Sequence, residues 1–187
     1  MLFDVFMFLL RAGVTLVGGA CLVRVLMRWR RMSFVNPVGQ IVLLFSDWIV
    51  APLSRLLPAS HRIDAASLLA AWLLELAQFA LLMAALGSRA WGILPVLALF
   101  GVVQLAISIA TALIILAAIL SWTGSSTLIQ NVLDHLADPL LAPIRRALPT
   151  LRGIDLSPLV AVLVLQVIGI VLGSWQVALL GTPTLLG

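Results

Sequence analysis

Two stretches of this chain are nearly the same: DWIVAPLSRLLP at residues 47–58 and DPLLAPIRRALP at residues 138–149. Asp, Ala, Pro, Arg, Leu and Pro recur at matching places, and the two stretches begin 91 positions apart. The same spacing relates Ile63-Asp64 to Ile154-Asp155 and continues into the apolar residues that follow. A long spacing that stays constant in this way indicates two copies of one structural unit.

The composition indicates an integral membrane protein. Of the 187 residues, 63% are hydrophobic and 10% are charged, whereas a soluble domain usually carries about a quarter charged residues. Four apolar stretches each reach the roughly 20 residues that cross a hydrocarbon core of about 30 Å. They cover residues 3–27, 64–86, 93–122 and 156–180. We therefore expect four transmembrane helices, two in each copy of the unit.

Between the two spans of each copy lies an apolar segment that is interrupted, at residues 36–58 and 128–149. Each contains prolines and an acidic residue near its middle, Asp47 in the first and Asp138 in the second. We expect the prolines to split each segment into pieces too short to span, which gives bent amphipathic or re-entrant helices. Fifth and sixth spanning helices are the alternative, and the two central acids argue against them.

The predicted fold is therefore an all-α membrane protein with four transmembrane helices in two parallel repeats, residues 1–90 and 91–187. Two spans per unit make the second copy enter the membrane in the same direction as the first, so the repeats are expected to be related by an axis along the membrane normal. Upstream of the interrupted segments, Trp29 and Trp122 close corresponding spans, and the spacing there is 93.

The distribution of arginine predicts the orientation. All eleven basic residues are arginine, and nine of them lie in or beside the two loops that contain the interrupted segments. The positive-inside rule places these loops in the cytoplasm and both termini outside. The net charge of +4 reflects few acidic residues, and because the arginines are not interleaved with exposed aromatic residues we expect no nucleic-acid partner.

Two charged residues lie well inside expected spans, Arg11 in the first and Glu75 in the second. An ionisable residue at that depth is a functional candidate by default. Gln166 occupies the position of Glu75 in the second copy, and Gln78 lies one helical turn beyond Glu75, so these four form a candidate intramembrane polar site. The alternatives are a structural Arg11–Glu75 ion pair, which we expect, and a proton or cation site.

The interrupted segments carry a second candidate motif, which would face lipid or a partner. Asp47 and Asp138 are expected to be helix N-caps, with an ion or headgroup ligand as the alternative. Asp64 and Asp155 are expected to begin the second and fourth spans. Arginine near anionic lipid contributes about 1 kcal/mol per charge. The full motif comprises Asp47, Pro52, Arg55, Asp138, Pro143, Arg145 and Arg146.

No catalytic or metal-binding pattern is present in the sequence. Cys21 is a single cysteine, so no internal disulfide can form, and neither histidine lies within a span. There is no phosphate-binding loop and no recognisable nucleophile–base pair. We therefore expect no enzymatic activity, no cofactor and no metal ion.

The motifs RVLMRW at residues 24–29, Asn36-Pro37 and APLSRLLP at 51–58 resemble the YggT family of small bacterial inner-membrane proteins. The second copy resembles it more closely, through residues 138–149 and GIDLSP at 153–158, although Thr127-Leu128 stands in place of Asn-Pro. The resemblance covers nearly the whole chain as a two-copy member.

This resemblance implies a multi-pass protein of the inner membrane whose relatives are linked to osmotic or ion tolerance, and whose plastid relatives, called YlmG, are linked to cytochrome b maturation and to membrane or nucleoid organisation. We therefore expect a non-enzymatic scaffold or assembly factor. The alternative is an ion-handling protein that uses Glu75. The expected partners are a bilayer with anionic headgroups and either another membrane protein or a second copy of the chain.

Overall fold

The structure is a computed structural model that describes residues 2–56, 64–87, 91–122, 127–147 and 155–181. The described residues form α-helices and one short 3₁₀ helix, without a strand among them, which confirms the all-α class. The elements are α1 (Leu2–Trp29), α2 (Pro37–Leu56), α3 (Ala65–Ala85), η1 (Trp91–Ile93), α4 (Leu94–Trp122), α5 (Leu128–Ala147) and α6 (Ser157–Gly181). Residues 1 and 182–187, which carry the two chain termini and the prediction made for them, lie outside the described part.

The four long apolar stretches form α1, α3, α4 and α6, with ends close to those expected from the sequence. Within the described residues, five helices are long and apolar enough to cross a bilayer, and the fifth is α2. Length and composition alone therefore do not separate α2 from the four expected spans, whereas α5 does not reach the same apolar content.

The expectation that prolines split the interrupted segments is wrong. Helix α2 continues through Pro52, and α5 continues through Pro139 and Pro143, each as a helix of 20 residues. A proline inside a helix removes one backbone hydrogen bond and crowds the carbonyl four residues earlier, which bends a helix without ending it when packing holds both sides. Here packing does so, since Val50 and Leu53 on either side of Pro52 pack in one cluster. Leu136, Leu141 and Ile144 likewise pack in one cluster around the prolines of α5. Residues 57–58 and 148–149, at the ends of the two segments, lie outside the described part.

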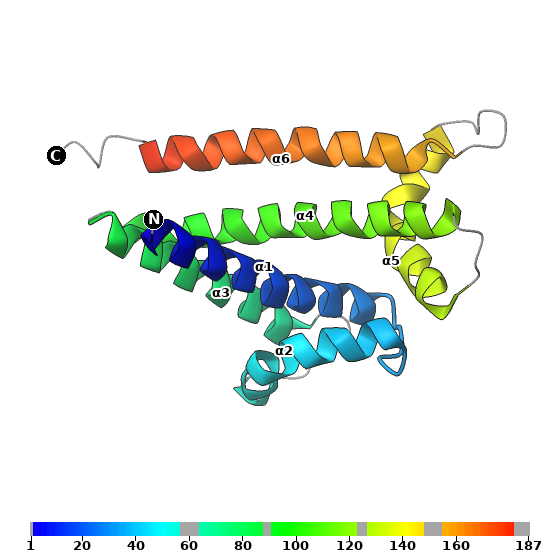
Figure 1. Ribbon diagram of the computed structural model, residues 1–187, viewed down its shortest axis with the longest axis horizontal. Helices are drawn as coiled ribbons and strands as arrows, with labels where there is room; N and C mark the ends of the chain where they lie inside the picture. Colours follow the sequence, from blue (N-terminus) through cyan, green and yellow to red (C-terminus); the bar gives the residue numbers. More distant parts are fainter. Residues whose placement is uncertain (1, 57–63, 88–90, 123–126, 148–154, 182–187) are drawn as a thin grey trace.

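The helices pack by the same scheme in the two halves of the chain, which we call the first unit (α1–α3) and the second unit (η1–α6). Helix α1 packs on α3 and α2, and correspondingly α4 packs on α6 and α5, while α3 and α1 contact α4 to join the units. Figure 1 shows α1 and α4 running in the same direction, with α3 and α6 running back. Helix α5 crosses the ends of α4 and α6 (Figure 1), so the second unit is closed at one end by a transverse helix.

The largest buried cluster holds α5 in this transverse position. One face of α5, including Leu133, Leu136 and Leu141, packs with Ile114 of α4 and Met27 of α1. The polar residues of α5 lie on its other faces, where Asp134 and His135 are exposed. Burial of one apolar face therefore helps to hold α5 across the bundle end.

Candidate functional site

Arginines near the end of α1 hold the three helices of the first unit together. Arg24 donates a hydrogen bond of 3.1 Å to Ser46 Oγ and forms an ion pair with Asp47, both on α2. Its Nε also lies 3.3 Å from Asp64 Oδ2, and Arg28 Nη1 lies 3.3 Å from the same oxygen. One end of α1 is thereby bound to the middle of α2 and to the beginning of α3.

Asp64 has the role expected of it at the start of a span. It is the N-cap of α3, and its Oδ1 accepts a hydrogen bond of 3.2 Å from the backbone N–H of Ser67. The Asp64 side chain is only 3% exposed. A carboxylate this buried needs its two guanidinium partners, because an uncompensated buried charge is strongly destabilising.

A second cluster joins the two units. Arg30, which follows α1, lies 3.5 Å from Asp138 of α5, and Arg145 lies 3.9 Å from the same carboxylate. Arg145 Nε also donates a hydrogen bond of 2.9 Å to Asp155, whose other oxygen accepts one of 2.9 Å from the backbone N–H of Ser157. Asp138 therefore forms an ionic link between the two units, and Asp155 precedes α6 as expected.

Two opposing influences act on Asp155. Burial raises the pKa of the carboxyl group, but hydrogen bonds from Ser157 and from Arg145, together with the charge of that guanidinium, lower it by more. The net pKa lies below the ordinary value for aspartate, so the group is a carboxylate at neutral pH.

The expectation that Asp47 and Asp138 cap helices is wrong. Both lie near the middle of continuous helices, α2 and α5, because those helices begin about ten residues earlier than the prolines suggested. Their carboxylates instead form ion pairs with Arg24 and Arg30.

The actual caps explain the Asn-Pro motif and its loss. Asn36 Oδ1 accepts a hydrogen bond of 2.7 Å from the backbone N–H of Gly39, and Pro37 is the first helical residue of α2. Asparagine is a favoured N-cap, and proline suits the first helical position because no N–H is needed there. In the second unit Thr127 Oγ1 accepts a hydrogen bond of 3.2 Å from the backbone N–H of Gln130. The second unit therefore keeps an N-cap residue although it lacks the Asn-Pro dipeptide.

The remaining motif residues lie on the surface. Pro52 and Pro143 are exposed on the outer faces of their helices. Arg55 and Arg146 are exposed as well, and within the described part of the chain neither forms an ion pair. Their charges are thus available to groups outside this molecule.

The expected ion pair between Arg11 and Glu75 is not formed among the described residues, although α1 and α3 pack together as expected. Arg11 is exposed on α1, whereas Glu75 is 6% exposed and faces α4. A Cβ added to Gly101 of α4 would lie 2.5 Å from Glu75 Oε2. The carboxylate therefore packs on the backbone of α4 at a glycine, and Arg11 lies close enough to act on it as a charge without forming an ion pair in the described part of the chain.

The other amides of the intramembrane group are not gathered around Glu75. Gln78 is one turn along α3 and has a buried Oε1 without a hydrogen bond in the described part of the structure. Gln166 is exposed on α6. Gln104 of α4 approaches Gly169 of α6, where an added Cβ would lie 3.5 Å from its Nε2. Of the four predicted polar residues, only Glu75 and Gln78 are on one helix face.

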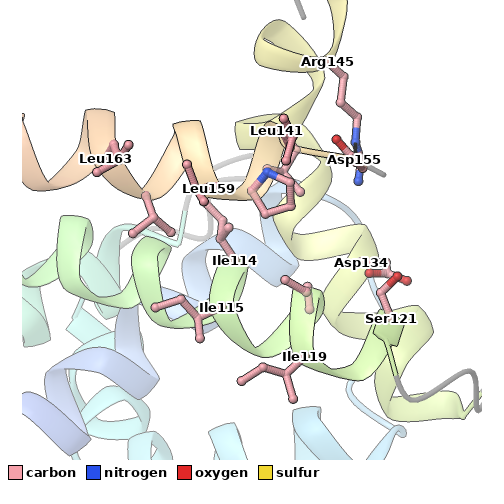
Figure 2. Close-up of a pocket in the computed structure, with 15 residues that line it drawn as sticks. Ile114, Ile115, Ile119, Ser121, Asp134, Leu141, Arg145, Asp155, Leu159 and Leu163 are labelled. Atoms are coloured by element: carbon pink, nitrogen blue, oxygen red, sulfur yellow. Dashed lines mark hydrogen bonds and ion pairs between the residues drawn. The ribbon is translucent and has the colours of Figure 1, made fainter. Parts of the chain in front are cut away.

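A pocket of about 670 Å³ opens in the second unit between α4, α5 and α6. Figure 2 shows apolar side chains of α4 and α6 along its length, with charged and polar groups gathered at the end that meets α5. The apolar walls include Ile115, Ile119, Leu159 and Leu163. The polar end is formed by Ser121, Asp134, Arg145 and Asp155.

Sequence reasoning missed this pocket, and the repeat explains why the second unit has it. Aligning Trp29 with Trp122 places Ala117 and Ser121, which line the pocket, at the positions of Arg24 and Arg28. In the first unit two guanidinium groups occupy this region, and in the second unit small side chains leave it open. Comparing the two copies position by position, to find charged residues that one copy lacks, would have indicated the pocket.

Long apolar helices, with their described ion pairs at the helix ends and on α2 and α5, define a multi-pass helical membrane protein. The chain belongs to the CCB3/YggT family, whose sequence model matches it twice, over residues 3–85 and 96–176. The resemblance drawn from the motifs is thus confirmed, and each match falls within one of the two predicted repeats.

Relatives from several bacteria are similar over most of their length. An uncharacterised protein called YggT from Escherichia coli K12 is 38% identical over 165 residues, which cover 86% of this chain and 85% of the relative. An uncharacterised protein from Vibrio alginolyticus, described by its place in the proC 3' region, is 31% identical and covers 82% and 85%. One from Haemophilus influenzae is 30% identical and covers 86% and 84%. No solved structure matches the chain.

Proposed function

We propose that this protein is a non-enzymatic scaffold of the bacterial inner membrane that organises partners at the cytoplasmic face. The observation that carries the proposal is the ion-paired network that fixes α2 and α5 to the ends of the long helices. Arg24 connects α1 with α2 and α3, and Arg30 connects the first unit with α5. Because ion pairs hold α2 and α5 in place, the two helices form a rigid surface. A rigid surface suits the binding of partner proteins better than a conformational change of the helices.

In the proposed membrane arrangement α1, α3, α4 and α6 span, the two units are related by an axis along the membrane normal, and both termini lie outside. Helix α5 carries Asp134, Asp138 and Arg145 and is too polar to span. Helix α2 is the repeat counterpart of α5 and carries the central ion pair of Asp47 with Arg24. Placing that pair at the bilayer centre would be costly, so we assign both helices to the cytoplasmic interface.

The surface of these helices suits contact with headgroups and proteins. Trp48 of α2 is 63% exposed, and tryptophan favours the membrane–water interface. Arg55 and Arg146 would attract anionic lipid headgroups or acidic groups of a partner. The protein partner would be another membrane protein or a second copy of this chain.

Site-specific photocrosslinking in native membranes tests the scaffold. A photoreactive residue at exposed His135 on α5 should capture a defined partner, and the same probe at Val167, which is 60% exposed on α6, should capture lipid only. Charge reversal by Arg146→Glu should abolish the capture from His135. Capture from Val167 alone, or capture unaffected by the charge reversal, would contradict the proposal.

Ion handling at Glu75 is the second candidate function. It is favoured by one observation, a buried carboxylate that forms no ion pair in the described part of the chain. A transporter usually gathers several polar groups at the membrane midplane, whereas the described glutamines are dispersed. Purified protein in liposomes should show no proton or cation flux under the scaffold proposal. A flux that Glu75→Gln removes would establish the second candidate instead.

A further inference from the structure

The pocket of the second unit has the size and polarity of a site for an amphiphilic molecule. Its volume of about 670 Å³ falls within the roughly 300 to 1,000 Å³ typical of ligand pockets. Leu159 and Leu163 on its wall are 59% and 57% exposed, so the apolar part faces the region that α6 would share with lipid chains. Within α6 the pocket lining runs from Pro158 to Leu163, about 8 Å at 1.5 Å per residue, and Asp155 lies beyond the start of the helix.

The charges at its polar end differ from those at the same place in the first unit. There, Arg24 and Arg28 supply two positive charges, and the residue that corresponds to Asp134 is Leu43. In the second unit both arginines are lost, Asp134 is gained and Arg145 takes the place of Ser54, so two positive charges are replaced by one while a carboxylate is added. The same region of the fold has thus changed from cationic to acidic, and the volume of two guanidinium side chains is vacated.

The present charges leave one carboxylate unbalanced. Asp155 is bound by Arg145 at 2.9 Å, but Asp134 forms no ion pair within the described residues. A guanidinium has five N–H donors. Arg145 uses Nε and Nη1 on Asp155 and Asp138 and is 47% exposed, so it retains donors for another anion.

From this geometry we propose that the pocket binds a zwitterionic phospholipid with a primary ammonium headgroup, of the phosphatidylethanolamine type. The ammonium lies against Asp134, where it supplies the positive charge that the lost arginines supply in the first unit. The phosphate accepts hydrogen bonds from Arg145. One acyl chain fills the groove between α4 and α6, along Ile115, Leu159 and Leu163. This site goes beyond the scaffold proposal and does not depend on it.

Native mass spectrometry of the purified protein in mild detergent tests the site. Phosphatidylethanolamine, phosphatidylcholine and phosphatidylglycerol with identical acyl chains are added in turn. Phosphatidylethanolamine should bind about tenfold more tightly than phosphatidylglycerol, the ratio expected for one charge-assisted hydrogen bond. Phosphatidylcholine, whose quaternary ammonium has no N–H, should bind less tightly than phosphatidylethanolamine.

Three variants distinguish lipid binding at this site from nonspecific lipid binding. Asp134→Asn should bring the affinities for phosphatidylethanolamine and phosphatidylglycerol to the same value. Leu159→Trp should fill the groove and remove binding of both. Leu68→Trp makes the same change at the corresponding position of the first unit, where Leu68 is 38% exposed, and should leave binding unchanged.

Several outcomes would overturn the site. They are equal binding of the three lipids by the unaltered protein, equal loss in Leu159→Trp and Leu68→Trp, or a pocket that retains no lipid because a helix of a partner fills it. Size-exclusion chromatography and circular dichroism show whether each variant is folded. Because the measurement is lipid binding, its failure leaves the crosslinking test of the scaffold unaffected.

Discussion

Replacing Gly101 by alanine tests how Glu75 is packed between α3 and α4. The added Cβ would lie 2.5 Å from Glu75 Oε2, 2.9 Å from its Cδ and 2.9 Å from Phe79 Cε2. Both neighbours are buried, at 6% and 9% exposed, so neither can move freely. Overpacking of this kind costs about 1 to 3 kcal/mol, and the better helix propensity of alanine offsets about 1 kcal/mol. We expect a net loss of up to about 2 kcal/mol.

The assay is thermal unfolding in detergent, compared with Gly169→Ala. At Gly169 the nearest atoms to an added Cβ lie at 3.5 and 3.6 Å, which is ordinary contact, so that variant should be as stable as the parent or more so. Combining Gly101→Ala with Glu75→Ala should recover part of the loss, because the closest contact is removed while the one with Phe79 remains. If Gly101→Ala melts at the same temperature as Gly169→Ala, Glu75 does not pack against this glycine.

Further predictions concern the charged network and the topology. Arg24→Met should destabilise the protein by about 3 kcal/mol in the same unfolding assay, because the buried Asp64 loses one of its two guanidinium partners. Arg55→Met removes an exposed arginine and should leave the stability unchanged. Equal effects of the two substitutions would contradict the proposed ion-pair network. Because the pKa of Asp155 is lowered in the folded state, its contribution to stability should be present above the ordinary aspartate pKa of about 4 and should be lost as the pH falls through the lower folded value. The difference in melting temperature between the parent and Asp155→Asn should accordingly shrink below about pH 4, and a difference that grows in acid would refute the assignment. A reporter fused to the C-terminus should be active on the outer side of the membrane and inactive in the cytoplasm, and cytoplasmic activity would contradict the topology.

The sequence predicted the long helices well and the interrupted segments less well, and the difference has a physical reason. A run of about 20 apolar residues has few alternatives to a spanning helix, so α1, α3, α4 and α6 lie close to their expected bounds. A proline has two outcomes, a break or a bend, and tertiary packing decides between them. The burial of Val50 and Leu136 depends on tertiary packing and cannot be predicted from the local sequence pattern. Because the helices were then predicted to start too late, Asp47 and Asp138 were predicted to be N-caps.

For the candidate site, local chemistry was predictable and long-range pairing was not. Asp64 was expected at a helix start and is found there, since capping involves only neighbouring residues. Arg11 and Glu75 were paired by depth in the membrane, but depth does not give the direction in which a side chain faces. Glu75 packs against Gly101 of α4, a glycine of the other unit, and forms no ion pair with Arg11 among the described residues. Predicting such a contact requires knowledge of how the two units pack against each other.

We assign α2 to the cytoplasmic face, where it does not span the bilayer. Single cysteines placed at exposed Gln40 and Ser54, near the two ends of α2, test it in a protein whose buried Cys21 is replaced by serine. A membrane-impermeant maleimide should label both positions in inverted vesicles and neither in intact spheroplasts. A helix of 20 residues is about 30 Å long, enough to cross the hydrocarbon core. Labelling of Gln40 from one side and Ser54 from the other would show that α2 is a fifth span and would contradict its place at the cytoplasmic face.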